Sequence, residues 1–206
     1  MKGLFITFEG IEGCGKSTQV ALLKVQLESR GRRVVVTREP GGTRVAELIR
    51  GVLLDGSNTD MTPATELLLY GAARAQHVDE LIRPALESGT DVVSDRFADS
   101  TTAYQGAGRQ LERSLIEEVH RLATRGTWPD VTFLLDLPVE AGLARARAVG
   151  EPDRIEKESI EFHRRVRDGF LRIAAQEPGR VYVIDATQGI EAVAAEVWRV
   201  IQGRLP

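Results

Sequence analysis

A stretch near the N-terminus, FEGIEGCGKST, places three glycines directly before a lysine and two hydroxyl side chains. Residues 10–17 match the pattern G-x-x-x-x-G-K-[ST], whose backbone N–H groups turn inward around phosphate oxygens. In this pattern the lysine reaches the terminal phosphates of a nucleotide and the next hydroxyl ligates Mg²⁺, so we predict these roles for Lys16 and Ser17. The residues expected to surround the nucleotide are Gly10, Ile11, Glu12, Gly13, Cys14, Gly15, Lys16, Ser17 and Thr18.

Arginines form three further groups along the chain. One begins at Arg38 in TREPGGT, a second begins at Arg96 in DRFADSTTAYQGAGR, and the third comprises Arg145, Arg147 and Arg154. Arginine is suited to phosphate because its planar guanidinium makes paired hydrogen bonds to phosphate oxygens. Separate arginine groups beside one phosphate-binding loop predict two phosphorylated substrates that face each other.

The elements that must position these residues alternate along the chain. Short apolar, β-branched runs at residues 4–8, 33–37, 91–94, 131–135 and 181–184 predict strands covered on both faces, as in a parallel sheet. Amphipathic segments predict helices over residues 16–30, 44–54, 64–88, 112–125, 139–148, 155–176 and 190–203. The order predicts an α/β fold, a doubly wound five-stranded parallel sheet with helices on both faces and ligands at the carboxyl ends of the strands.

The composition is that of a single globular domain over residues 1–206. The chain is 42% hydrophobic and 28% charged, and its net charge of −3 provides no field that would attract nucleic acid. Its one cysteine, Cys14, excludes an intrachain disulfide and fits a reducing compartment. No apolar run approaches the roughly 20 residues of a membrane span, and the first residues do not form a signal peptide. We therefore expect a cytoplasmic protein that binds neither nucleic acid nor membrane.

Five segments together resemble a known family. EGIEGCGKST, TREPGGT, LLLYGAARAQHV, DRFADSTTAYQGAGR and RARAVGEPDR are similar to those of thymidylate kinases of the bacterial type, over residues 4–187. The phosphate-binding loop is shared by many families, whereas TREPGGT combined with DR…AYQG is far more specific. The resemblance implies a P-loop NTPase fold with a short lid, transfer of the ATP γ-phosphoryl group to dTMP, dependence on Mg²⁺, and a homodimer.

The resemblance also implies roles for individual residues toward dTMP. Arg38 would clamp the dTMP phosphate, and Arg96 would bridge the phosphates of donor and acceptor. Tyr70 would stack on thymine, and Arg74, four residues later on the same helix face, would donate to a thymine carbonyl. Glu12 would accept a hydrogen bond from the sugar 3′-hydroxyl. The full set of expected dTMP contacts is Glu12, Arg38, Tyr70, Arg74, Arg96, Thr101, Tyr104 and Gln105.

Two assignments stay open at this point. Asp95, after the third predicted strand, is the first candidate to hold Mg²⁺ together with Ser17, and Asp136 is the second. Relatives often carry aspartate where this chain has Ala73, so a support for Arg74 is either missing or comes from elsewhere.

Positioned cations are expected to carry the catalysis, because phosphoryl transfer has a loose transition state with charge spread over oxygen atoms. The expected catalytic set is Lys16, Arg96, Arg145, Arg147 and Arg154. The last three belong to a predicted lid over residues 145–156. Arg145 and Arg147 are two residues apart on a helix and cannot point the same way, so the identity of the key lid cation stays open.

Two other interpretations compete with this one. The first is a different nucleotide kinase; the predicted contact of Arg38 with a phosphate argues against a kinase whose acceptor is a nucleoside. The second is a nucleotide-dependent switch; a GTPase switch is disfavoured because the chain has no N-K-x-D motif.

The histidines His77, His120 and His163 show no metal-ligand spacing and are expected at the surface or the core edge.

Overall fold

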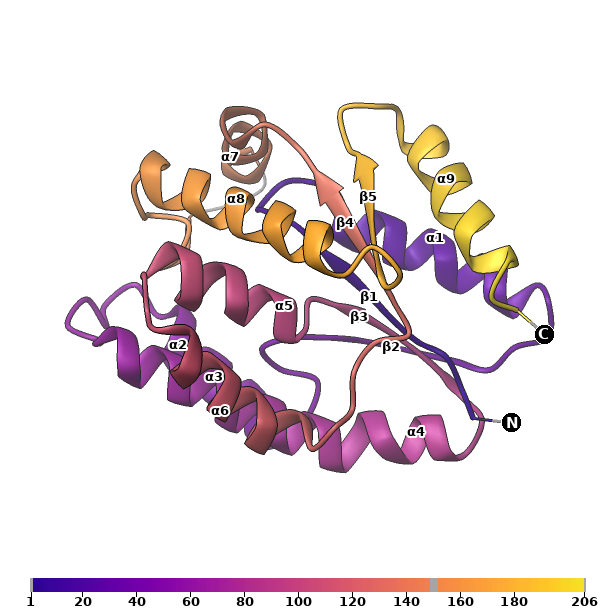
Figure 1. Ribbon diagram of the computed structural model, residues 1–206, viewed down its shortest axis with the longest axis horizontal. Coiled ribbons are helices and arrows are strands. Elements are labelled where there is room, and N and C mark those ends of the chain that lie inside the picture. Colours follow the sequence, from indigo (N-terminus) through magenta and orange to yellow (C-terminus); the bar gives the residue numbers. More distant parts are fainter. Residues whose placement is uncertain (1, 149–151, 206) are drawn as a thin grey trace.

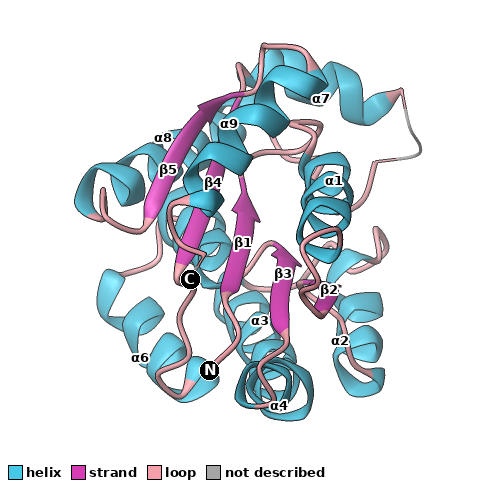
Figure 2. Ribbon diagram, turned by 90° about the vertical axis from the view of Figure 1, so that its right-hand side faces the viewer, coloured by secondary structure: helices cyan, strands magenta, loops and turns pink. Residues whose placement is uncertain are grey.

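The computed structural model describes residues 2–148 and 152–205. At its centre lies a five-stranded sheet in the order β2-β3-β1-β4-β5, with every pairing parallel. The arrows of β1, β3, β4 and β5 accordingly share one direction in Figure 2. The predicted α/β fold is confirmed. The strands are β1 (Phe5–Glu9), β2 (Val34–Arg38), β3 (Asp91–Asp95), β4 (Val131–Asp136) and β5 (Val181–Asp185).

Every strand extends one residue further toward its carboxyl end than the apolar pattern predicts. That residue is charged in each case: Glu9, Arg38, Asp95, Asp136 and Asp185. The apolar pattern stops at the last hydrophobic side chain, whereas the backbone ladder continues and pairs Asp95 with both Phe8 and Arg38. The carboxyl edge of the sheet is therefore lined with ionisable groups, where an α/β fold binds its ligands.

Burial distinguishes the central strands from the outer ones. β1, β3 and β4 are buried almost throughout, as predicted for strands covered on both faces. β2 and β5 are the edge strands, and each alternates between covered and exposed positions, so the prediction was wrong for them.

Helices cover both faces of the sheet (Figure 1). α1 and α9 pack together on one face, while α4 and α8 contact the sheet from the other, and α3 packs against both α2 and α6. The helical segments, with η for π-helix, are α1 (Lys16–Glu28), α2 (Arg44–Leu54), α3 (Pro63–His77), η1 (Val78–Ile82), α4 (Arg83–Glu87), α5 (Ala98–Thr101), η2 (Thr102–Gly108), α6 (Arg113–Thr124), α7 (Val139–Arg147), α8 (Ile160–Gln176) and α9 (Ile190–Gln202).

Three helical segments differ from the prediction. The helix predicted over residues 64–88 is present, but it is π-helical over Val78–Ile82. The helix expected from residue 155 begins at Ile160, because the Ser159 side chain caps it by accepting from the Phe162 N–H. Residues 98–108, for which no helix was predicted, form α5 and η2. Packing against α8 stabilises this segment: a Cβ placed on Gly169 would lie 2.8 Å from the Ala107 Cβ. Tertiary contact thus overrides the weak local propensity of its glycines and hydroxyl residues.

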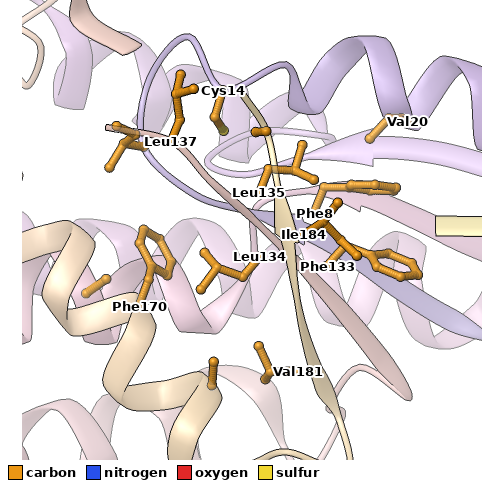
Figure 3. Close-up of a cluster of buried hydrophobic side chains, with 14 of the residues drawn as sticks. Phe8, Cys14, Val20, Phe133, Leu134, Leu135, Leu137, Phe170, Val181 and Ile184 are labelled. Atoms are coloured by element: carbon orange, nitrogen blue, oxygen red, sulfur yellow. The ribbon is translucent and has the colours of Figure 1, made fainter. Parts of the chain in front are cut away.

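The core contacts the phosphate-binding loop directly. Leu134 and Leu135 of β4 point to opposite faces of the sheet, Leu134 toward Phe170 of α8 (Figure 3). Cys14 belongs to the same buried cluster, so the loop is anchored by its own side chain. Within residues 2–148 and 152–205, no helix combines the length and the apolar character that a membrane crossing requires.

Candidate active site

The phosphate-binding loop connects β1 to α1 in the predicted strand–loop–helix context. Gly10 and Gly13 have φ values of 134° and 68°, which side-chain-bearing residues rarely adopt. A Cβ on Gly13 would lie 2.1 Å from the Gly142 carbonyl oxygen of α7, and one on Gly10 would lie 2.5 Å from the Leu135 carbonyl oxygen. Glycine is required at both positions because the loop passes so close to neighbouring backbone.

Lys16 lies folded over the phosphate-binding loop. Its Nζ donates to the Ile11 carbonyl oxygen at 2.8 Å and to the Gly10 carbonyl oxygen at 3.3 Å, and only 8% of the residue is exposed. Ser17 and Thr18, the next two residues of α1, are exposed. The loop therefore presents one lysine charge and two hydroxyl groups at the amino end of a helix, as a triphosphate site needs.

Arg96 connects the phosphate-binding loop to the segment after β3. Its φ is 71°, unusual for a residue with a side chain. Nη1 donates to the Gly10 carbonyl oxygen at 2.8 Å and to Ser100 Oγ at 3.2 Å, and Nη2 lies 3.3 Å from Glu12 Oε1. The guanidinium also lies over the Tyr104 ring, 5.0 Å from its centroid. Burial opposes the charge, but the neighbouring Tyr104 and the carboxylate of Glu12 raise the pKa of Arg96 well above its ordinary value.

A buried carboxyl, Glu9, holds the segment that follows Arg96. It accepts from the Phe97 N–H at 2.7 Å and from Ser100 Oγ at 2.6 Å. Burial, reinforced by the nearby charge of Asp99, raises the pKa of Glu9 to about 8. Sequence reasoning gave Glu9 no role, although a glutamate continuing an otherwise apolar strand is a visible signal.

Glu12 forms the boundary between the loop and a neighbouring cavity. Its Oε1 accepts from Tyr104 Oη at 2.5 Å and faces Arg96. Burial alone would raise the pKa of Glu12, but His163, Arg96, Lys16 and Tyr104 outweigh it and lower the pKa to about 2. The carboxylate is therefore ionised at neutral pH and acts only as an acceptor.

The neighbouring cavity has a volume of about 180 Å³ and lies between α2, α3, η2 and the segment before α8. Every predicted dTMP contact except Arg38 lines it. The lining residues are Glu12, Glu39, Pro40, Arg50, Leu54, Tyr70, Arg74, Arg96, Phe97, Ser100, Thr101, Tyr104, Gln105, Asp153, Ile155 and Glu156. One wall thus belongs to the phosphate-binding loop, so a ligand in the cavity lies beside a ligand in the loop.

Arg74 is buried and held on three sides. Its Nε donates to Glu39 Oε2 at 2.8 Å, Nη1 to Thr101 Oγ1 at 3.0 Å, and Nη2 to the Phe97 carbonyl oxygen at 3.1 Å. Glu39 is held in turn by His77 Nδ1, 3.0 Å from its Oε1. The support left open by Ala73 therefore comes from Glu39, a residue of TREPGGT to which sequence reasoning assigned no role.

The two arginines near TREPGGT occupy different environments. Arg38 is exposed at the end of β2 and pairs with the Glu47 carboxylate at 3.0 Å, outside the cavity. Arg50, on α2, does line the cavity and donates to the Pro40 carbonyl oxygen at 2.9 Å. Burial and the nearby charge of Arg38 lower the pKa of Arg50. The Glu39–Pro40 peptide bond is cis.

The two metal candidates also differ. Asp136 receives two hydrogen bonds from Arg167, at 2.7 and 2.8 Å, which engage both of its carboxylate oxygens. Asp95 lies at the carboxyl end of β3, between Phe8 of β1 and Arg38 of β2. In the part of the chain that the structure describes, no group of three or more His, Cys, Asp and Glu side chains is arranged around a metal site. A cation here would need oxygen ligands from a phosphate, as Mg²⁺ commonly has.

The arginines of the predicted lid do not share one environment. Arg145 and Arg147 are exposed on α7, and Arg145 Nη1 lies 3.5 Å from the Ala186 carbonyl oxygen after β5. Arg154 is buried, with Nη1 2.6 Å from Glu66 Oε2 and Nε donating to the Leu53 carbonyl oxygen at 2.8 Å. Residues 149–151 of the predicted lid, including Val149, lie outside the described residues.

Comparison with known proteins gives a single family. The family model described as thymidylate kinase matches residues 8–197. The thymidylate kinase of Geobacter sulfurreducens is 54% identical over 210 residues, which cover 99% of each protein. That of Thermomicrobium roseum is 53% identical over 198 residues, 96% of this chain and 93% of that protein. A solved thymidylate kinase from Ehrlichia chaffeensis is 38% identical, with a TM-score of 0.80, over 98% of this chain and 99% of that chain.

Proposed function

The chain belongs to the thymidylate kinase family, and we propose that its reaction takes place between the phosphate-binding loop and the neighbouring cavity. In this reaction the γ-phosphoryl group of ATP is transferred to dTMP, giving dTDP and ADP. ATP binds with its phosphates in the loop. dTMP binds in the cavity, with its phosphate toward Arg96. The observation that carries the proposal is that Arg96 contacts both sides: it reaches the Gly10 carbonyl oxygen and the Glu12 carboxylate of the loop while forming part of the cavity wall.

The residues of the cavity suit the parts of dTMP. Arg74 donates three hydrogen bonds to protein, and a guanidinium has five N–H groups, so donors remain for a thymine carbonyl. Tyr70, Thr101, Tyr104 and Gln105 supply the remaining walls for base and sugar. Glu12 accepts the 3′-hydroxyl. Arg38 remains our predicted phosphate clamp, and the position of Arg50 supports a second cation in that role.

Ser17 and Asp95 would hold Mg²⁺, with phosphate oxygens and water as its remaining ligands. When bound, the ion neutralises charge on the phosphates. The exposed Ser17 hydroxyl and the Asp95 carboxylate at the sheet edge support this pairing. The engagement of Asp136 by Arg167 argues against Asp136 as the ligand.

Lys16, Arg96 and one of the two exposed arginines of α7, Arg145 or Arg147, supply the positive charge around the transferred group. The close approach of α7 to Gly13 supports Arg145 as the lid cation nearer to ATP. The pairing of Arg154 with Glu66 supports an anchoring role at the end of the lid, beside the catalytic role that we predicted.

We also propose that the protein is a cytoplasmic homodimer and that each subunit is one domain over residues 1–206. Apolar side chains are exposed on three neighbouring helices, which supports association through this surface: Leu48 and Val52 on α2, Leu68 on α3, and Leu115 and Leu122 on α6. The single buried cysteine is compatible with a reducing compartment.

The variant Arg96→Ala tests the proposal. We expect kcat for dTMP phosphorylation to fall by about 1,000-fold or more, because an arginine that stabilises the transferred phosphoryl group contributes on that order. The dissociation constant for ATP should change by less than about threefold. Arg113→Ala, which removes an exposed arginine paired only with Glu117 among the described residues, is the matched control. A folded Arg96→Ala enzyme that keeps more than about a tenth of wild-type kcat would contradict the proposal.

A further inference from the structure

His163, near the start of α8, has an environment that the fold alone does not explain. The residue is fully buried, so the expectation of a surface or core-edge position was wrong. Neither ring nitrogen forms a hydrogen bond with any described residue. A buried polar group without a partner costs stability, and this ring has two.

The Glu12 carboxylate lies beside His163. His163 Nδ1 lies 3.4 Å from Glu12 Oε2, and Oε2 is itself buried without a hydrogen-bond partner in the described chain. The other oxygen, Oε1, receives Tyr104 and faces Arg96. The separation of 3.4 Å is slightly longer than a normal hydrogen bond, so the contact is electrostatic and needs only a small shift to become one.

We propose that His163 is a positioning residue for dTMP: its Nδ1–H holds the Glu12 carboxylate in the orientation in which that carboxylate accepts the 3′-hydroxyl of the sugar. The inference rests on the proposed role of Glu12. His163 does not line the cavity, so it acts only through Glu12. Without the ring, Oε2 would be buried with no donor facing it, and the carboxylate would gain by rotating away from Tyr104 and Arg96.

The tautomer with a proton on Nδ1 directs its N–H dipole at Oε2 and leaves Nε2 as an acceptor. The low pKa of Glu12, to which His163 contributes alongside Arg96 and Lys16, is consistent with an ionised acceptor held in place. α8 follows directly on the segment that carries Asp153, Ile155 and Glu156 of the cavity wall. His163 therefore links the phosphate-binding loop to the helix behind the cavity.

Three variants test the inference, each assayed with dTMP and with its 3′-deoxy analogue. His163→Phe keeps a ring but removes the donor, and His163→Asn puts an amide at the place of Nδ1. His120→Phe is the matched control, because His120 is also buried with an unpartnered ring nitrogen but is hydrogen-bonded to Thr102 instead of facing Glu12.

We expect His163→Phe to lower kcat/KM for dTMP by about tenfold and for the 3′-deoxy analogue by less than about twofold, since the lost interaction exists only with the hydroxyl. His163→Asn should recover most of the loss. His120→Phe should change both substrates by the same factor. If His163→Phe does not fold, His163→Gln replaces it in the comparison with His163→Asn. The Gln amide lies at the place of Nε2 and not of Nδ1, so His163→Gln should show the loss that His163→Asn recovers.

Equal losses for both substrates in the His163 variants would overturn the inference and make His163 a packing residue. The variant Glu12→Gln distinguishes a wrong role for His163 from a wrong role for Glu12 in the proposed function. If Glu12→Gln loses the preference for the 3′-hydroxyl while His163→Phe keeps it, only the inference fails. If Glu12→Gln keeps the preference, the role of Glu12 itself is wrong and the inference fails with it.

Discussion

Glu39 supports Arg74 from a segment 35 residues earlier in the chain, and the two are nearly inaccessible to solvent. A buried ion pair is most costly when only one partner is removed, because the other charge is left without compensation. His77 holds the second Glu39 oxygen, so the position of Arg74 depends on a chain of buried contacts that extends to Thr37.

Glu39→Gln tests the support that Glu39 gives to Arg74. We expect KM for dTMP to rise about tenfold, KM for ATP to change by less than about twofold, and the free energy of unfolding to fall by about 2–4 kcal/mol, because Arg74 loses its counter-charge. Steady-state kinetics and chemical denaturation measure these quantities. Glu47→Gln, at the more exposed pair with Arg38, should cost less than about 1 kcal/mol. An unchanged KM for dTMP in Glu39→Gln would refute the support role.

The buried carboxyl of Glu9 should make the stability of the protein depend on pH. Burial raises the pKa of this carboxyl from 4.5 to about 8. Between these values the folded protein keeps a proton that the unfolded chain releases, so this group lowers stability as pH rises. Relative to Glu9→Gln, the wild type should lose up to about 1.4 kcal/mol of unfolding free energy per pH unit from pH 5 to pH 8. Denaturation curves at several pH values, without Mg²⁺, test this. A wild type that gains stability over that range relative to the variant would contradict it.

Motif residues were predictable at this scale, whereas their supports were not. The glycine loop, Arg74, Arg96 and Tyr104 stand in patterns with a recognisable chemistry. Glu9, Glu39 and His163 act through contacts between segments distant in sequence. Glu39 and His163 have no informative spacing, and the position of Glu9 after an apolar run marks it as unusual without showing what it contacts. Arg38 shows the opposite case, because its motif predicts phosphate contact while its side chain pairs with Glu47 outside the cavity.

At the scale of elements, the wall that carries Thr101, Tyr104 and Gln105 is helical, through α5 and η2. Local sequence could not predict this, since glycines and hydroxyl residues disfavour helices and the stabilising contact comes from α8. A π-helical turn widens the spacing of side chains and is frequent at functional sites, which fits the place of Tyr104 and Gln105 in the cavity wall.

α7 carries two arginines whose contributions to catalysis can be compared directly. Arg145 and Arg147 are both exposed on the same helix, which makes them a matched pair of substitutions. We expect Arg145→Ala to lower kcat at least tenfold, because the Cβ of Arg145 lies beside Gly13 of the phosphate-binding loop. Arg147→Ala should change kcat by less than about twofold. Equal losses of kcat in the two variants would contradict the assignment of Arg145 as the lid cation nearer to ATP. A larger loss in Arg147→Ala would assign that role to Arg147.

At the scale of the whole molecule, the exposed leucines of α2, α3 and α6 predict a homodimer. Leu68→Glu places a charge within this surface and should shift the protein from dimer to monomer in sedimentation experiments. Val25→Glu on α1 is the control, because Val25 and Leu68 are both 63% exposed. A wild type that sediments as a monomer, or a Val25→Glu variant that dissociates equally, would argue against this interface.

The alternation of strands and helices predicted the sheet and its parallel pairing, and the near-continuous apolar character of β1, β3 and β4 matches their burial on both faces. The exposed faces of β2 and β5 were not foreseen, since the order of strands follows from tertiary packing and not from local pattern. The same limit applies to the cavity, which exists only where α2, α3 and η2 meet.

The central claim is that ATP in the phosphate-binding loop and dTMP in the cavity meet at Arg96. A crystal structure with dTMP and a non-hydrolysable ATP analogue tests it most directly. The account predicts thymine beside Tyr70 and Arg74, the 3′-hydroxyl on Glu12, and the dTMP phosphate within hydrogen-bond distance of Arg96. A dTMP molecule bound outside the cavity, or one whose phosphate points away from Arg96, would contradict it.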